Sequence, residues 1–450
     1  MSKTFLPWPD SSSPEFQEGR LNTEDHSAGF VVNARMVFWV FFVLIHMAIA
    51  SQIYWLSSDI LEGDGSCDEL TVSLRYPPMR VPETPITMQY QAQGRLCADF
   101  AQIYFPSQKK MALKEAYAID TTLDPWLRPS KYPPLMHFIF SYTLCRLPYG
   151  QACLLHLAVQ TVLFIASFVF AFFVLRLRKY LMPSLLLLNV CLFLTPVGLS
   201  FFERGQFTLY LGLCYLWLML ALVTGKWRYS IVTALFGFLK WTSFPVIVVV
   251  LSVYLIHSKN WQEIRERLVL SVLCFITIML LFFTLARDGM FFLEALFEQE
   301  LTFVPMGITL LQLLPRFIVK TVPFFLVGVG LVNRLCFKQD VSSLLPFFAG
   351  SAIMLLMYPT FAFDYSDPCL LAFVPFMIHW AKSPGVDRSM GRVVLTLFII
   401  FLIVASDAIT VLGFSEREDI IMYIIMSLVL VGTPFLVPKR ALEEQPSGLH

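Results

Sequence analysis

The stretch DFAQIYFPSQKKMALKEAYAIDTTLDPWLRPSKYPPL, residues 99–135, is polar and mixed in charge, and hydrophobic segments lie on both sides of it. The whole chain of 450 residues is 57% hydrophobic and only 14% charged. A soluble protein of this length cannot bury so much apolar surface. The apolar segments lack the strict alternation of a membrane β-barrel. The sequence therefore predicts an all-α, polytopic membrane protein that holds this large polar loop at one membrane face.

Hydrophobic runs that can cross a bilayer recur along the chain. They lie at 36–55, 152–175, 181–199, 207–223, 229–239, 245–257, 268–286, 316–335, 343–358, 369–381, 393–412 and 420–437. Lys and Arg residues between the runs favour the cytoplasmic side. Keeping all their clusters there requires the two short runs within 229–257 to cross separately and the piece 135–148 not to cross. The alternative is that 229–257 is one broken helix. The first arrangement predicts about twelve crossings with both termini inside.

The opposite membrane side then collects the polar segments that are unusual for a membrane protein. Besides the 99–135 loop, these are FFERGQF (201–207), LKWTSFP (239–245), 287–315 and YPTFAFDYSD (358–367). Within them, residues 290–313 are amphipathic and interrupted by Pro305, which predicts either a helix lying at the membrane interface or an ordinary loop helix. This asymmetry indicates a single active face.

Four sequence features occur in a telling order. They are an acidic loop after the first span, Y-P-P-L at 132–135, R-G-Q at 204–206, and K-x-x-x-x-P from Lys240 to Pro245. In this order and spacing the chain resembles the GT-C superfamily of integral-membrane glycosyltransferases. It is similar to the bacterial polyprenol-phosphate-mannose-dependent mannosyltransferases and to the catalytic subunit of GPI mannosyltransferase I. The resemblance covers residues 36–260 and extends to the rest of the chain only in hydropathy.

The resemblance implies a domain organisation. Residues 36–260 are expected to form a GT-C-like catalytic membrane module with an extracytoplasmic or lumenal loop at 56–151. Residues 261–437 are expected to form a C-terminal transmembrane module. The expected cytoplasmic tails are residues 1–35 and 438–450. The implied setting is a bacterial inner membrane or the endoplasmic reticulum membrane, with the active face extracytoplasmic or lumenal.

The resemblance also implies a reaction. A sugar, with mannose as the first expectation, is transferred from a polyprenol- or dolichol-phosphate donor to a glycan or glycolipid acceptor. The transfer inverts the configuration at the anomeric carbon. A carboxylate takes the proton of the acceptor hydroxyl, and cations hold the leaving lipid phosphate. No cofactor or metal is implied. The expected partners are the donor, the acceptor, membrane lipids and an accessory membrane subunit, and the net charge of +1 gives no reason to expect nucleic acid.

Asp99 is the predicted general base. It opens the motif D-F-x-x-x-Y, as the acidic residue does in the corresponding loop of the family. Many GT-C enzymes carry this acid closer to the first span, where this chain has Asp59, so Asp59 is the chief alternative. The same zone also holds Asp64 and Asp68, and Asp120 and Asp124 are weaker alternatives. A loop aspartate that is merely solvated is the structural alternative.

The predicted substrate-binding residues are Tyr104, Lys131, Tyr132, Arg204, Gln206, Lys240 and Asp364. Lys131 and Tyr132 precede two prolines that fix an extended entry into the next helix. An interfacial tyrosine is equally typical of the aromatic belt of a membrane protein. An arginine beside a glycine can bind a phosphate through two hydrogen bonds, although Arg204 has Glu203 beside it as an alternative partner.

The remaining candidates rest on their positions at helix ends. Gln206 is expected at a helix N-terminus, where backbone N–H groups favour anions. Lys240 interrupts apolar sequence, which predicts phosphate binding by the resemblance or snorkelling of its ammonium group to the surface. Asp364 is expected in acceptor binding, where the bacterial branch often carries histidines. Asp367 precedes a proline and is predicted to cap a helix.

The cysteines and the competing functions complete the prediction. Most of the nine cysteines lie in apolar runs, where a thiol acts as a small hydrophobe. Cys67 and Cys97 lie in the first large loop, and in an oxidising compartment they are candidates for a disulfide. The alternative functions are a multi-pass lipid or solute transporter and a catalytically inactive GT-C-like scaffold. Transporters typically show internal repeats and polar residues at mid-membrane, whereas here the polar residues gather at one face.

Overall fold

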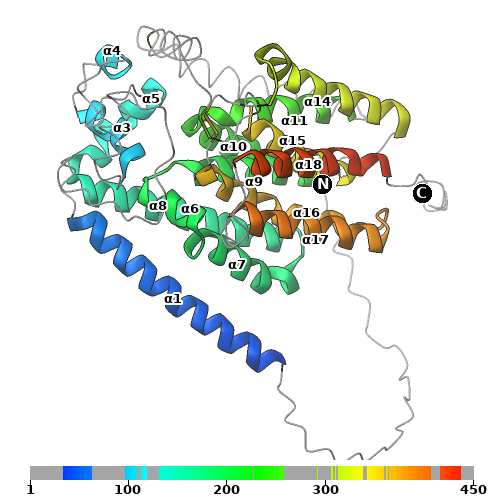
Figure 1. The fold of residues 1–450 in the computed structure, drawn as a ribbon, viewed down its shortest axis with the longest axis horizontal. Coiled ribbons are helices and arrows are strands. Elements are labelled where there is room, and N and C mark those ends of the chain that lie inside the picture. Colours follow the sequence, from blue (N-terminus) through cyan, green and yellow to red (C-terminus); the bar gives the residue numbers. More distant parts are fainter. Residues whose placement is uncertain are drawn as a thin grey trace, which may run out of the picture. The chain divides into compact units, whose positions relative to one another are not determined.

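The structure of the protein is a computed structural model (Figure 1). It describes residues 34–62, 97–108, 113–118, 130, 132–226, 228–257, 291, 306–307, 310, 313–337, 342–358, 361–362, 364–406 and 416–436. The chain forms two units, Met1–Leu44 and Ile45–His450. The boundary between the units falls within the first helix, Ala34–Glu62.

The described chain is built almost entirely of helices. The α-helices are α1 (Ala34–Glu62), α3 (Ala98–Gln108), α4 (Leu113–Ala116), α5 (Pro134–Tyr142), α6 (Tyr149–Val174), α7 (Arg178–Phe193), α8 (Pro196–Glu203), α9 (Thr208–Thr224), α10 (Arg228–Leu239), α11 (Phe244–His257), α14 (Arg316–Phe337), α15 (Leu345–Leu356), α16 (Val374–Ala381), α17 (Arg388–Ala405) and α18 (Glu416–Leu436). The 3-10 helices are η1 (Leu144–Arg146), η2 (Trp241–Ser243), η4 (Ser342–Leu344) and η5 (Asp364–Phe373). Strands β1 (Met306–Gly307) and β2 (Phe361–Ala362) form one parallel pair.

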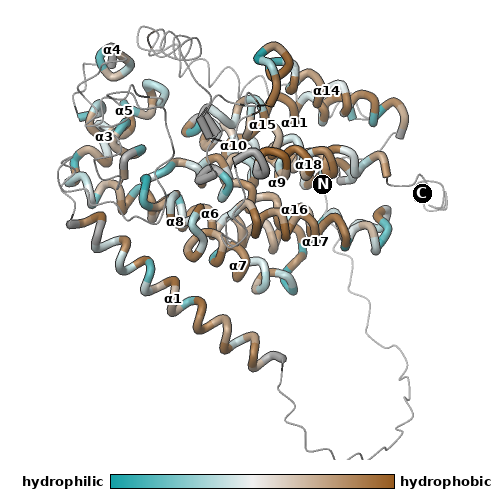
Figure 2. The backbone as a smooth tube through the Cα atoms, in the orientation of Figure 1, coloured by the Kyte–Doolittle hydropathy of each residue, from teal (hydrophilic) through white to brown (hydrophobic). Residues whose placement is uncertain are grey.

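Four of the described helices are long and apolar enough to cross a membrane. They contain Met36–Ser58, Tyr149–Val174, Arg316–Cys336 and Arg388–Ala405. Helices α7 and α8, bent by 60° at a short break, make a fifth if they count as one span. Five shorter apolar helices accompany them, and Figure 2 shows how hydrophobic residues run along the helices. The predicted all-α fold is therefore confirmed in the described residues, and the long apolar helices are compatible with the predicted membrane protein. The predicted count of about twelve crossings stays a prediction.

Two uncertain segments of the sequence take defined forms. The piece 135–148 forms α5, which has nine residues and is too short to span a bilayer, and the 3-10 turn η1. The 229–257 region forms two helices, α10 and α11, separated by Lys240 and the turn η2. The interfacial helix predicted at 290–313 lies mostly outside the described residues, but at Met306–Gly307 the prediction is wrong because β1 forms there.

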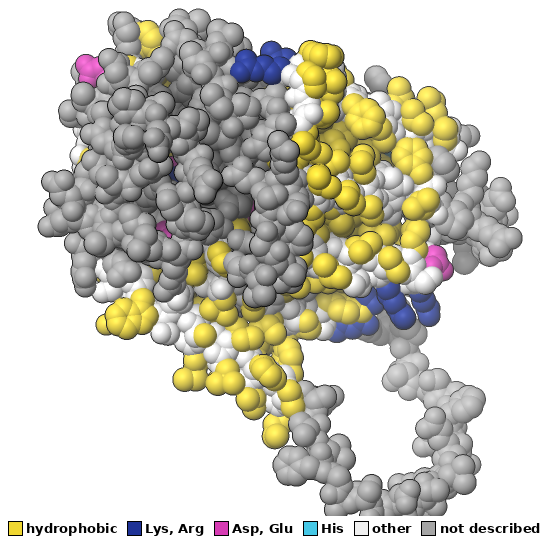
Figure 3. Space-filling view, viewed as in Figure 1, with side chains coloured by type: hydrophobic (Ala, Val, Ile, Leu, Met, Phe, Trp, Pro, Cys, Tyr) yellow, Lys and Arg dark blue, Asp and Glu magenta, His cyan; other side chains and the backbone are white. Residues whose placement is uncertain are grey.

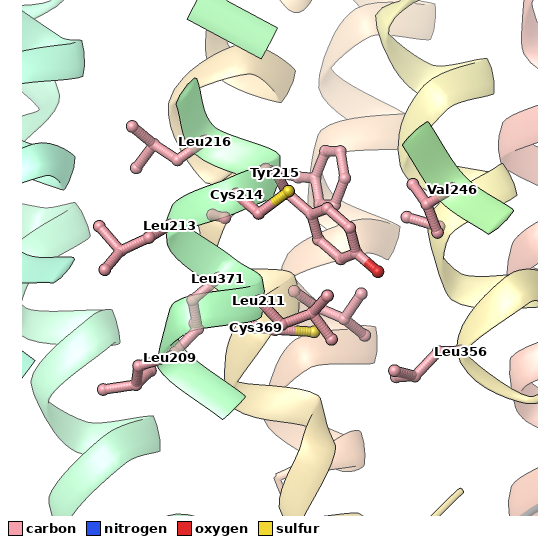
Figure 4. Packing of buried hydrophobic residues seen from close by; sticks show 14 of the residues in the cluster. Leu209, Leu211, Leu213, Cys214, Tyr215, Leu216, Val246, Leu356, Cys369 and Leu371 are labelled. Atoms are coloured by element: carbon pink, nitrogen blue, oxygen red, sulfur yellow. The ribbon is translucent and has the colours of Figure 1, made fainter. Parts of the chain in front are cut away.

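Helix α9 is the centre of the core. Its sequence TLYLGLCYLWLMLALVT is apolar around its whole circumference, as expected for a helix packed on all sides. It packs against α10, α6 and η5. Figure 4 shows Cys369 and Leu371 of η5 beside the buried side chains of α9. At Gly212 an added Cβ would lie 3.2 Å from the Cα of Cys369, so the missing side chain lets η5 approach closely. Gly225, in the left-handed conformation, ends the helix.

Helices α15 and α18 pack through small residues, and this contact is open to test. An added Cβ at Gly350 of α15 would lie 2.8 Å from the carbonyl oxygen of Ser427 and 3.0 Å from the amide nitrogen of Val431, both backbone atoms of α18. We expect Gly350→Ala to destabilise the protein by about 1–3 kcal/mol through this overpacking. Thermal unfolding in detergent, followed by intrinsic fluorescence, measures the effect.

Gly432→Ala is the matched control for this substitution. Gly432 lies in α18 and has no atom within 4 Å of an added Cβ. The unfolding midpoint of this variant should equal or exceed that of the wild type, since alanine favours a helix more than glycine does. Equal midpoints for the two variants would contradict the close packing of α15 on α18.

Candidate functional site

Asp99 lies in the first turn of α3, which is anchored at its start. Cys97, two residues earlier, forms a disulfide with Cys153 of α6. The backbone N–H of Asp99 donates to the carbonyl of Arg204 (2.9 Å). The hydroxyl of Tyr149 donates to the carbonyl of Cys97 (2.7 Å). The position of Asp99 is thus fixed from both the α6 side and the α8–α9 turn.

The disulfide corrects one prediction. The partner of Cys97 is Cys153, which lies in α6, and not Cys67, which lies outside the described residues. The sequence did not predict this pairing, because the two cysteines are 56 residues apart and Cys153 lies in an apolar segment. Both cysteines are buried.

The R-G-Q motif forms the tight turn between α8 and α9. Gly205 has φ +63°, a left-handed conformation that glycine adopts without steric cost. An added Cβ there would also lie 2.8 Å from Cβ of Phe100 and 3.2 Å from Sγ of Cys153. Glycine is therefore required both by the backbone conformation and by the space, and the turn places Arg204 and Gln206 on either side of it.

Arg204 and Gln206 both bind the carboxylate of Asp99. The Nε atom of Arg204 lies 2.9 Å from Oδ2 of Asp99, and Nε2 of Gln206 donates to the same oxygen. The Asp99 and Arg204 side chains are 11% and 22% exposed, so the pair is largely but not fully buried. Two donors on one oxygen stabilise the charged carboxylate and fix its direction.

Tyr132 and Lys240 complete the cluster. The hydroxyl of Tyr132 donates to the backbone carbonyl of Asp99 (3.4 Å), and its ring packs on Phe207 with the ring centroids 4.5 Å apart. The ammonium nitrogen of Lys240 lies 6.0 Å from the centroid of the Tyr132 ring. Burial lowers the pKa of Lys240, while the negative charge of Asp99 raises it. Lys240, at the break between α10 and η2, therefore belongs to the surroundings of Asp99. We call Asp99, Tyr132, Arg204, Gln206 and Lys240 the Asp99 cluster.

The other predicted site residues have different outcomes. Tyr104 lies in α3, but its hydroxyl donates to the carbonyl of Leu147 (2.6 Å), and its ring packs against Tyr149 and not in the Asp99 cluster. Asp364 is the first residue of η5, and its side chain lies outside the described part. Asp59 lies in α1 with its side chain likewise not described. The predicted residues Lys131, Asp64, Asp68, Asp120 and Asp124 lie outside the described residues.

The prediction that Asp367 caps a helix is wrong. The helix η5 begins at Asp364, so Asp367 and the following proline lie within it. The Asp367 carboxylate is buried and accepts a hydrogen bond from the hydroxyl of Tyr423 in α18. Asp367 therefore links η5 to α18.

Sequence reasoning missed a pair of polar residues behind the cluster. Gln160 of α6 donates from Nε2 to the carbonyl of Gln206 (2.6 Å), and Nε2 of His156 lies 3.3 Å from the same oxygen. The His156 ring stacks on Phe100 and packs against Phe207. Their i, i+4 spacing within an otherwise apolar helix was the signal that a buried polar site lies there.

A second missed network holds Tyr132 in place. The Ser107 hydroxyl donates to the carbonyl of Ile103, so its oxygen is the acceptor for Nδ1–H of His137 (2.9 Å). The other ring nitrogen, Nε2, accepts from the hydroxyl of Ser130 (2.8 Å), whose oxygen accepts from the backbone N–H of Tyr132 (3.3 Å). His137 is therefore neutral and fully hydrogen-bonded, and it ties α5 to α3 and to the segment before Tyr132.

Comparisons with known proteins found no match. No family model, no curated protein and no solved structure matches this chain. In the part of the chain that the structure describes, no three His, Cys, Asp or Glu side chains gather to form a metal site. The chemistry of the Asp99 cluster therefore has to be argued from its own residues.

The burial of His137 predicts a pH dependence of stability. Burial lowers the pKa of this histidine to about 3, below its ordinary value of 6.5. The unfolded chain then binds a proton that the folded protein does not bind. Stability is fully present above pH 6.5 and falls toward pH 3, with a slope of about 1.4 kcal/mol per pH unit from this one group. The free energy of unfolding measured between pH 7.5 and 4.5 tests this.

The comparison needs two variants. His137→Gln cannot take up the proton. The slope of its unfolding free energy against pH should therefore be smaller than that of the wild type by about 1.4 kcal/mol per pH unit. Phe138→Leu in α5, which alters an exposed side chain and no titratable group, should keep the wild-type slope. An unchanged slope in His137→Gln would show that this histidine is not held neutral.

Proposed function

We propose that this protein is an integral-membrane glycosyltransferase of the GT-C type. It transfers a sugar, with mannose the first expectation, from a polyprenol- or dolichol-phosphate donor to an extracytoplasmic or lumenal acceptor. The observation that carries the proposal is the convergence of the Asp99 cluster. Four chain segments that the sequence motifs mark separately contribute to it, namely the start of α3, the Tyr132 segment, the α8–α9 turn and the break after α10.

The composition of the cluster suits phosphate-linked sugar transfer. It contains one carboxylate and two cations, Arg204 and Lys240, so its formal charge favours an anionic ligand. In the proposed reaction Asp99 accepts the proton of the acceptor hydroxyl while the new glycosidic bond forms. Arg204 and Lys240 stabilise the negative charge that develops on the leaving lipid phosphate. This division of roles needs no metal, because a monophosphate can be held by cations alone.

The contact between Arg204 and Asp99 is compatible with both roles. The Nε–H bond to Asp99 uses one of the five N–H donors of a guanidinium group. A donor phosphate bound beside the pair would draw Arg204 toward itself and weaken its hold on the carboxylate. Asp99 would then be a stronger base when the donor is present than when the site is empty.

The disulfide supports the proposed sidedness. Disulfides form and persist in oxidising compartments and are rare in the cytosol. Cys97 stands two residues before Asp99, so the compartment that oxidises it also faces the Asp99 cluster. An extracytoplasmic or lumenal active face is the side on which a lipid-phosphate sugar is used in the proposed reaction.

A transfer assay tests the proposed reaction. We expect purified protein in detergent to move radiolabel from polyprenol- or dolichol-phosphate-mannose to a lipid in a crude membrane extract. Asp99→Asn should lower the turnover at least about 100-fold while the protein stays folded, because the general base is removed. Asp387→Asn is the matched control, since Asp387 is exposed and only caps α17. No transfer from mannose, glucose or arabinose donors by the wild type would overturn the enzymatic proposal.

The same assay separates the roles of the cations. Arg204→Ala and Lys240→Ala should each raise the KM for the lipid donor, because each removes a charge that holds the phosphate. The KM for the acceptor should change much less. A donor KM equal to that of the wild type in both variants would assign these residues to structure alone.

A further inference from the structure

A second charged site lies away from the Asp99 cluster, where two turns distant in sequence meet. The first turn joins α6 to α7, and the second joins α16 to α17. Tyr180, in the first turn of α7, lies close to both turns. The ammonium nitrogen of Lys179 is 5.1 Å from the centroid of that ring, and the ammonium nitrogen of Lys382 is 4.5 Å from it. Two lysines from turns about 200 residues apart therefore converge on one aromatic side chain.

The charge around Tyr180 is strongly one-sided. The cations of the two turns are Arg176, Arg178, Lys179, Lys382 and Arg388, and all are exposed; we call these five residues the basic edge. The described parts of the turns contain one carboxylate, Asp387, which accepts hydrogen bonds from the backbone N–H groups of Ser389 and Met390 at the start of α17. Like charges near one another repel, and a bound anion relieves that repulsion. Figure 3 shows dark blue Lys and Arg side chains gathered beside hydrophobic surface.

The position of the basic edge relative to the membrane identifies the anion. The candidate membrane span of α6 ends at Val174, and that of α17 begins at Arg388, so the basic edge lies next to the ends of two candidate spans. Exposed apolar side chains continue from it along both helices, with Phe173 45% exposed on α6 and Val393 57% exposed on α17. A ligand that combines a phosphate with acyl chains fits this arrangement, because a basic pocket between helix ends takes the headgroup and the apolar faces take the chains.

We propose that the basic edge binds the phosphate of an anionic phospholipid. Lys179 and Lys382, which both lie beside Tyr180, contact the phosphate, and the acyl chains lie along α6 and α17. The site is on the opposite membrane side from the Asp99 cluster in the topology that the positive charges favour. It does not depend on the proposed transfer reaction and anchors the protein whatever that reaction is.

Lipid retention measures this directly. The full-length protein is purified with mixed phosphatidylglycerol and phosphatidylcholine, and bound lipids are counted by native mass spectrometry. We expect phosphatidylglycerol to be retained in preference to phosphatidylcholine. Combined Lys179→Gln and Lys382→Gln substitutions should weaken phosphatidylglycerol binding roughly 30-fold, from the usual contribution of each basic residue near a lipid surface. Combined Lys179→Arg and Lys382→Arg substitutions should preserve it.

The controls keep the proposal falsifiable. Combined Lys226→Gln and Arg228→Gln substitutions remove the same charge from the exposed α9–α10 turn and should leave the retention unchanged. Thermal unfolding of each variant confirms that it is folded. Equal retention of the two lipids by the wild type would overturn the proposal. So would an equal loss of phosphatidylglycerol in the Lys179→Gln, Lys382→Gln variant and in the Lys226→Gln, Arg228→Gln variant. Stabilisation by inorganic phosphate alone that matches stabilisation by phosphatidylglycerol vesicles would overturn the assignment to a lipid.

Discussion

The ion pair between Asp99 and Arg204 is the interaction on which the site depends. In a mostly apolar protein a largely buried charge is costly unless it is paired and hydrogen-bonded. Here the second donor from Gln206 and the backbone contact between the same two segments meet that requirement. The pair therefore fixes α3 against the α8–α9 turn. It also holds a carboxylate and a guanidinium together, with both side chains still partly exposed.

The surrounding networks act as supports in two layers. Behind the pair, Gln160 and His156 hold the backbone of Gln206, and the disulfide holds the start of α3 to α6. In front of it, neutral His137 holds the segment that carries Tyr132. Such supports keep reacting groups within a few tenths of an ångström of a working geometry, which is what catalysis by positioned charges requires. The stability of α3 and α5 and the proposed chemistry thus rest on the same contacts.

The residues that the sequence predicted best are those whose type conflicts with their apolar surroundings. Asp99, Arg204 and Lys240 are charges that a membrane protein keeps only for a reason, and the structure brings them to one place. Cys153 could not be predicted as a disulfide partner, because a cysteine in an apolar helix has no local mark of its pairing. The prediction that Asp367 caps a helix was wrong because the helix begins three residues earlier, at Asp364. That helix is a 3-10 helix, which the local sequence does not reveal. The role of His156 and Gln160 could not be predicted from a local motif, since their shared partner is a backbone carbonyl about 46 residues away.

The measurement that tests this account most directly is a double-mutant cycle on the central ion pair. The free energy of unfolding in mixed micelles is measured for the wild type, Asp99→Asn, Arg204→Gln and the combined variant. We predict a coupling energy of about 1–3 kcal/mol between the two positions, because each single change leaves a largely buried partner without its counter-charge. Effects that add within about 0.5 kcal/mol would contradict the account, since they would show that the two side chains do not meet in the folded protein.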